Sequence, residues 1–179
     1  WVRADRLELF TNGHRILTRD LPPTSKIEKA NLTFTLPRPL HDAHLIAIAT
    51  GPGITEPFWE SPRPYVPTTP NHTPRVQGAT NPIFIDGNGD GKYNAPRAQA
   101  RQLLAKHARD LSALFNGLAQ YDQSVSAQAA ALLHQTDHDL NPPTLRRHWT
   151  RTPSTKAGFT AYLGTLQKNR PTPGFMKSE

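Results

Sequence analysis

The chain has 179 residues, of which 36% are hydrophobic, with 18 prolines, 11 glycines and no cysteine. This length allows one full domain or a small domain with an appendage, and the proline content predicts much irregular backbone. The lack of cysteine excludes disulfides, thiolate metal sites and cysteine nucleophiles, and no apolar run approaches the roughly 20 residues that cross a bilayer.

The net charge of +7 is unevenly distributed. Residues 1–140 carry 14 Lys and Arg against 13 Asp and Glu, whereas residues 141–179 carry seven against one. The basic character therefore lies in the C-terminal part. Because the chain begins Trp1-Val2-Arg3 without an initiator Met, we expect it to be a piece of a longer protein.

The first 20 residues predict a β-hairpin. Arg6–Phe10 alternates polar and apolar residues, with the period of two that is typical of a half-buried strand. Asn12 and Gly13 follow, and both tolerate the positive φ angles of a tight two-residue turn. His14–Leu17 is then expected to be the returning strand.

Further strands are expected up to residue 95. Ala30–Leu36 alternates again, and His44–Ala49 is a nearly continuous apolar run that is typical of a buried central strand. Residues 51–80 hold seven prolines and predict a long irregular loop, after which Asn81–Ile85 gives a last short strand. The expected core residues are Leu7, Leu9, Phe34, Leu45, Ile46 or Ile48, and Phe84.

From Pro96 the apolar residues recur at the three-and-four spacing of helices. One amphipathic helix is expected over residues 97–119, with Leu111 among the residues on its inward face. Asp122 can accept hydrogen bonds from free N–H groups, so it is expected to cap a second helix that runs to about Leu133.

Two shorter helices complete the C-terminal part. Asn141–Trp149 starts with a capping residue and two prolines, which suit a first helical turn. Ser154 or Thr155 is expected to cap the fourth helix. The fold class is therefore α+β: an Ig-like or fibronectin-like β-sandwich over residues 1–95, a helical segment over 96–170 and a flexible tail over 171–179.

Three motifs in the strand region are similar to those of a known family. After Trp1, they are Asp5–Gly13 (DRLELFTNG), Asp42–Gly51 (DAHLIAIATG) and Thr80–Gly91 (TNPIFIDGNGDG). Their combination resembles the C-terminal region of bacterial PHP-domain metallohydrolases of the CehA/McbA type, especially long members from planctomycete-type bacteria. The resemblance covers about residues 1–100 and implies a carbohydrate-module-like sandwich that follows a catalytic domain.

The resemblance also implies a parent enzyme that binds its metals through His-x-His, Asp and Glu ligands. The sequence contains no His-x-His, so we expect this chain to lack the catalytic domain and to carry no catalytic residue. The implied location is outside the bacterial cytoplasm, in the periplasm or secreted. The expected partners are the parent catalytic domain or other chains of the same protein.

The run from Asp86 to Lys92 is the strongest candidate site. Asp86, Asn88 and Asp90 offer oxygens at positions one, three and five, with glycine at six and the Lys92 carbonyl at seven, as in the first half of an EF-hand calcium loop. Position twelve is Arg97 instead of the usual Glu, so another ligand is needed. The candidates are Asp5, Asp20, Asp110 and water. We expect Ca²⁺ here; the alternative is an ordinary turn.

Other residue groups have simpler interpretations. The pairs His41/His44 and His134/His138 have spacings at which histidines can bind zinc, but no third ligand is evident, and surface or capping roles are favoured. Arg146–Arg151 is basic with one Trp. A solvated helix face is favoured there over nucleic-acid binding.

These observations predict a non-catalytic accessory or structural module of a PHP-type metallohydrolase-like protein, stabilised by Ca²⁺. One alternative is a stand-alone module that binds glycans or acidic polymers through the basic tail or through Phe58, Trp59 and Tyr65 of the long loop. The other is an enzyme fragment whose site is completed by another chain. The absence of a G-x-S-x-G motif leaves no hydrolytic triad to assign.

Overall fold

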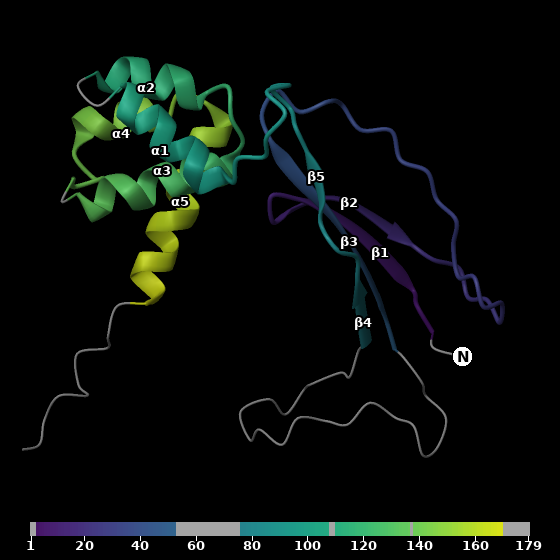
Figure 1. The fold of residues 1–179 in the computed structure, drawn as a ribbon. Helices are drawn as coiled ribbons and strands as arrows, with labels where there is room; N and C mark the ends of the chain where they lie inside the picture. Colours follow the sequence, from purple (N-terminus) through teal and green to yellow (C-terminus); the bar gives the residue numbers. More distant parts are fainter. Residues whose placement is uncertain (1–2, 53–75, 108–109, 137, 170–179) are drawn as a thin grey trace, which may run out of the picture. The chain divides into compact units, whose positions relative to one another are not determined.

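The computed structural model describes residues 3–52, 76–107, 110–136 and 138–169. The chain divides into two compact units. One unit is Trp1–Pro39 with Ala43–Ile85 and contains the strands; the other is Leu40–Asp42 with Asp86–Glu179 and contains the helices (Figure 1). The described residues therefore have a mixed α+β fold of one antiparallel sheet and five helices. None of these helices has the length and apolar character that spanning a membrane requires.

The sheet has the strand order β2-β1-β3-β4, and β5 also pairs with β3. Its strands are β1 (Arg6–Thr11), β2 (His14–Asp20), β3 (Ala43–Gly51), β4 (Val76–Ala79) and β5 (Ile83–Ile85). Every pairing is antiparallel. The long apolar strand β3 is thus central, as its sequence predicts.

The predicted hairpin is confirmed. Asn12 and Gly13 have φ angles of 46° and 83°, and they connect β1 directly to β2. Asn12 is also buried, and it accepts a hydrogen bond from the His44 backbone N–H at 3.1 Å while its own N–H donates to the His44 carbonyl at 3.0 Å. The turn residue therefore joins the hairpin to β3.

The strand expected at Ala30–Leu36 is absent. Residues 21–42 contain no helix or strand, and Ile27 within them is 97% exposed. Polar–apolar alternation indicates that one face can be buried, but a strand also needs a neighbour to pair with, and the flanking prolines cannot donate to a ladder.

The expected core of the strand region is also mostly wrong. Leu9 is buried, but Phe34 is only half-buried and Phe84 is 59% exposed. The described strands form a single sheet, so a second layer, and with it the Ig-like sandwich, is not confirmed.

The helical unit contains α1 (Pro96–Lys106), α2 (Leu111–Leu118), α3 (Gln123–Gln135), α4 (Pro143–Trp149) and α5 (Pro153–Lys168). The single helix expected over residues 97–119 is therefore two. Asp110 begins the second one, because its carboxylate accepts a hydrogen bond from the Ala113 N–H at 3.0 Å. Leu111, expected to face inward, is 40% exposed in the first turn of α2.

Asp122 caps α3 as predicted, with its carboxylate accepting from the N–H groups of Ser124 and Val125 at 2.9 and 3.0 Å. The capping residue expected for α5 is wrong, because Thr152 rather than Ser154 or Thr155 precedes the first turn. Thr155 is instead buried and donates to the Trp149 carbonyl at 2.9 Å.

The hydrophobic core of the helical unit gathers around Phe159, which is fully buried. Its ring stacks on Trp149 with 5.6 Å between ring centroids, and it also contacts Phe115 at 5.4 Å. Buried leucines and alanines of α1, α2, α3 and α4 belong to the same cluster. This unit therefore has the continuous core that the sheet unit lacks among its described residues.

Candidate functional site

The loop that follows β5 is folded around the carboxylate of Asp86. Asp86 Oδ1 accepts hydrogen bonds from the N–H groups of Gly89 at 2.6 Å and Asp90 at 3.2 Å, and its Oδ2 accepts from Gly91 at 2.7 Å. Three successive N–H groups thus point towards the first acidic residue, which curls the chain into a tight turn.

The side chains of Asn88 and Asp90 also accept hydrogen bonds from backbone N–H groups of the loop, each from the residue two positions further on. Asn88 Oδ1 accepts from the Asp90 N–H at 3.0 Å, and Asp90 Oδ1 accepts from the Lys92 N–H at 2.8 Å. Gly91, at position six, has a φ angle of 77°, in the region that favours glycine. The side chains predicted to be ligands are therefore gathered on one short loop.

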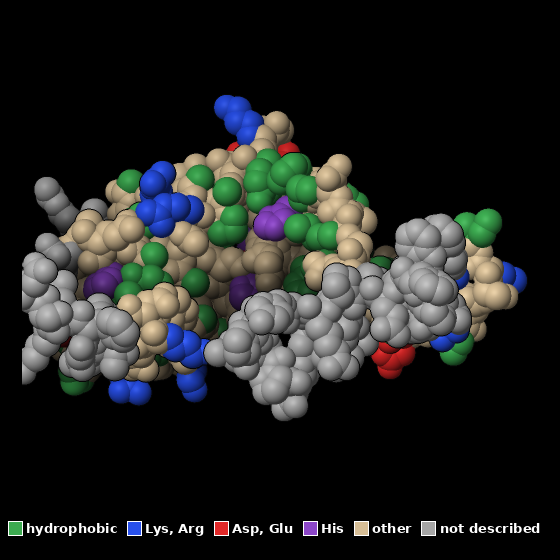
Figure 2. All heavy atoms as spheres, turned by 90° about the horizontal axis from the view of Figure 1, so that it is seen from below, with side chains coloured by type: hydrophobic (Ala, Val, Ile, Leu, Met, Phe, Trp, Pro, Cys, Tyr) green, Lys and Arg blue, Asp and Glu red, His purple; other side chains and the backbone are tan. Residues whose placement is uncertain are grey.

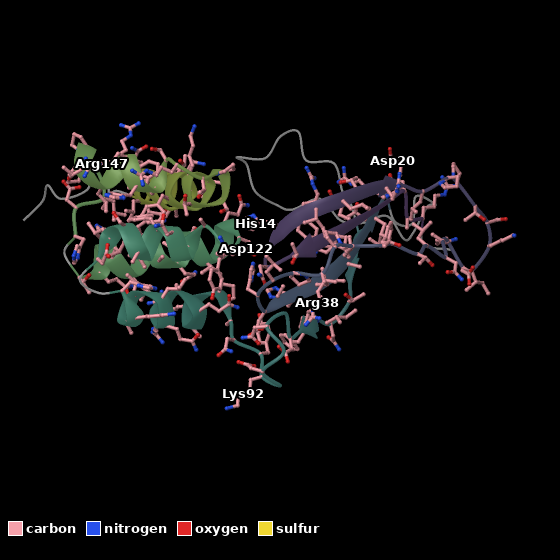
Figure 3. All side chains as sticks on the ribbon, turned by 90° about the horizontal axis from the view of Figure 1, so that it is seen from above. His14, Asp20, Arg38, Lys92, Asp122 and Arg147 are labelled. Atoms are coloured by element: carbon pink, nitrogen blue, oxygen red, sulfur yellow. The ribbon has the colours of Figure 1, made fainter. Side chains whose placement is uncertain are left out.

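Lys92 takes part through its backbone only. Its side chain is exposed and points away from the loop into solvent (Figure 3). Position twelve, Arg97, donates instead to the side chains of Gln128 at 3.1 Å and Gln135 at 2.9 Å, so it is committed to α3. Within the described ranges, no group of three or more His, Asp or Glu side chains is placed to hold a metal ion.

Of the residues suggested as additional ligands, Asp110 caps α2, where its carboxylate accepts a hydrogen bond from the Ala113 N–H at 3.0 Å. Asp5 and Asp20 belong to the sheet unit. Water is the other candidate from the sequence.

Asp42, which the sequence analysis did not identify as a site residue, lies behind the loop. It is 1% exposed, and its carboxylate accepts from the Gly87 N–H at 3.2 Å, the Asn94 N–H at 2.7 Å and the Asn94 side-chain amide at 3.1 Å. Burial alone would raise the pKa of Asp42, but the hydrogen bonds from Asn94, Gly87 and Asn88 outweigh it and lower the pKa below its usual value of 3.8.

The backbone around Asp42 is held as firmly as its side chain. Gln99 of α1 is buried, and its amide donates to the carbonyls of Asp42 at 3.0 Å and Asn94 at 2.6 Å. Gly87 lies so close to this segment that a Cβ there would be 2.1 Å from the His41 carbonyl oxygen. The one sequence feature that could have pointed to Asp42 is its position directly before the long apolar strand β3.

Hydrogen bonds to neighbouring groups involve three of the four histidines in the two pairs. His41 Nδ1 donates to the Asp42 carbonyl at 3.0 Å, and its Nε2 accepts from the Asp122 N–H at 3.2 Å, so both ring nitrogens are used within the helical unit. His44 lies in β3, in the other unit. His134 bonds the Tyr162 hydroxyl at 2.8 Å, whereas His138 bonds Thr136 at 3.0 Å.

The basic segment also has a structural explanation. Trp149 is buried and donates to the Leu140 carbonyl at 3.3 Å, and the Arg146 guanidinium lies 5.9 Å from the centre of the Trp149 ring. On the face of the molecule in Figure 2, Lys and Arg side chains are scattered among neutral and apolar ones. The aromatic residues Phe58, Trp59 and Tyr65 lie outside the described residues.

Comparison of the chain with protein-family models, with curated proteins and with solved structures finds no match.

Proposed function

We propose that this chain is a non-catalytic accessory module of a larger PHP-type metallohydrolase-like protein, and that its Asp86–Lys92 loop binds one Ca²⁺ ion. The observation that carries the calcium proposal is the folding of this loop around Asp86. Calcium in EF-hand loops is bound by oxygens at the same positions, with glycine at position six making the sharp turn. Here Gly91 occupies that position with a positive φ angle of 77°.

The ligand set favours a weak calcium site. Asp86, Asn88, Asp90 and the Lys92 carbonyl supply about four oxygens, whereas Ca²⁺ takes six to eight. Arg97 is bound to Gln128 and Gln135 and offers no oxygen at position twelve, so water completes the shell. We expect a dissociation constant in the range of extracellular modules, about 10⁻⁴–10⁻³ M. Such a site is filled only where calcium is abundant, which fits a periplasmic or secreted location.

Exposed apolar side chains on strand β5 support the accessory role. Ile83 is 63% exposed and Phe84 is 59% exposed. Ile83 pairs with Leu45 and Phe84 pairs with His44, so these two side chains lie on opposite faces. A sheet with apolar residues on both faces is stable only when further layers cover it. We propose that residues of the parent protein complete a sandwich with this sheet.

Thermal unfolding with calcium and with EDTA tests the calcium site. An ion that binds only the native state stabilises it by RT ln(1 + [L]/Kd), about 2.7 kcal/mol at a hundredfold excess over Kd. Calcium should therefore raise the melting temperature of the helical unit, and EDTA should return it to the metal-free value. Asp90→Asn should abolish the response, because it removes one of the two carboxylates.

The matched control for that experiment is Asp139→Asn, which makes the same chemical change at an exposed residue outside the loop. It should respond to calcium like the unmodified chain. Equal melting temperatures with calcium and with EDTA, in the unmodified chain, would mean that the loop is only a turn.

A further inference from the structure

The buried carboxylate of Asp42 accepts hydrogen bonds from residues on both sides of the proposed calcium ligands. We infer that Asp42 sets the calcium affinity of the Asp86–Lys92 loop by fixing its shape before the ion binds; this inference rests on the calcium site proposed above. Asp42 is 45 residues from Gly87 and 52 residues from Asn94 along the chain, and its carboxylate bonds both. It therefore connects the two sides of the loop to a distant segment.

The two bonded positions bracket the ligands. Gly87 is the second residue of the loop, and Asn94 lies two residues beyond Lys92. Between them lie the two remaining side-chain ligands and the Lys92 carbonyl. The N–H groups of Gly87 and Asn94 donate to the Asp42 carboxylate at 3.2 and 2.7 Å. Because both flanks are held in this way, the loop has fewer conformations to lose when an ion binds. A site that is ordered in advance binds more tightly, because less conformational entropy is lost on binding.

Asp42 is suited to this role because its own position is fixed by two helices. Gln99 of α1 donates to its carbonyl at 3.0 Å. The His41 ring also donates to that carbonyl, and it accepts from the Asp122 N–H at the start of α3. Asp42 is thus connected by hydrogen bonds to α1 and to the start of α3, both in the helical unit.

Asp42 acts as a positioning residue rather than as a ligand. The partners of its carboxylate are N–H groups, and the residue is 1% exposed. Residues that hold metal ligands through hydrogen bonds typically change metal affinity about 10–100-fold when mutated. Asp42→Asn places an amide among these donors, so it should weaken calcium binding by about tenfold or more.

Terbium luminescence on the full chain measures this effect directly. Tyr93, next to Lys92, can transfer excitation energy to a bound lanthanide, and calcium competition then gives the calcium dissociation constant. Asp42→Asn should raise that constant about tenfold or more. Asn94→Ala, which keeps the backbone N–H and removes one of the three bonds, should raise it less, and it provides the test if Asp42→Asn does not fold.

Gly158→Ala is the control for general destabilisation. It perturbs the packing of α5 on α3, where a Cβ would be 2.5 Å from the Gln123 carbonyl oxygen, and it touches no loop residue. Below its melting temperature it should bind calcium like the unmodified chain.

The outcomes separate the two proposals. Binding by the unmodified chain with unchanged affinity in folded Asp42→Asn and Asn94→Ala would overturn the role of Asp42 and leave the calcium site intact. An equal loss of affinity in Gly158→Ala would also overturn it, because the effect would then be one of stability. No binding by the unmodified chain would overturn the calcium site and, with it, this inference.

Discussion

His148 shows how a single titratable side chain can affect the stability of the helical unit. It is 8% exposed, stacks on Phe115 with 5.7 Å between ring centroids, and its buried Nδ1 has no hydrogen-bond partner among the described residues. Burial lowers the pKa of His148 below 6.5, and the nearby Arg147 and Arg151 lower it further, against an opposing effect of Asp110. The native structure therefore favours the neutral ring.

This shift makes the free energy of unfolding depend on pH. Between the native pKa of His148 and its unfolded value of 6.5, the unfolded chain binds more protons than the native one, so stability falls as the pH is lowered through this window. His148→Gln carries no titratable group and should lose less stability on acidification. Urea unfolding at about pH 5 and about pH 7.5 for both proteins measures the difference. An identical loss in both would show that His148 is not responsible.

At the scale of elements, α5 packs closely on α3 through a glycine. A Cβ at Gly158 would be 2.5 Å from the Gln123 carbonyl oxygen and 2.6 Å from the Ser126 Cβ, closer than real contacts allow. At Gly164, in the same helix, a Cβ would meet nothing within 4 Å. The two glycines therefore have different roles: the first permits contact between helices, and the second only lowers helix propensity.

Replacing each glycine with alanine distinguishes these roles. Gly158→Ala should cost about 1–3 kcal/mol of stability, because the added methyl group forces the two helices apart. Gly164→Ala should be neutral or stabilise the protein by about 0.5–1 kcal/mol, because alanine loses less conformational entropy in a helix. Chemical denaturation of both variants gives the free energies. If both changes have the same sign, the packing of α5 on α3 is not as described.

Local sequence signals predicted the elements that depend on neighbouring residues. The hairpin at Asn12-Gly13 and the helix capped by Asp122 each require only a few adjacent residues, and both are confirmed. The strand expected at Ala30–Leu36 depended on a distant partner that alternation cannot specify. The helix expected over residues 97–119 was too long because the capping role of Asp110 was not recognised.

At the scale of the whole molecule, the α+β composition followed from the change of apolar spacing near Pro96. Two features could not be predicted from the sequence. The first is whether the strands form one layer or two, because this depends on which faces of the sheet are covered by other parts of the protein. The second is the set of hydrogen bonds of Asp42, which join residues 45 and 52 positions apart in the chain. No local sequence pattern indicates that these residues are close in space. The candidate ligands Asp86, Asn88 and Asp90 could be named from the sequence because their spacing is short.

Titration calorimetry of the full chain with Ca²⁺ measures directly whether the Asp86–Lys92 loop binds calcium. We expect one ion per chain, a dissociation constant of about 10⁻⁴–10⁻³ M, and loss of the binding heat in Asp90→Asn. The absence of heat at millimolar Ca²⁺, or binding that persists unchanged in Asp90→Asn, would rule out the proposed calcium site.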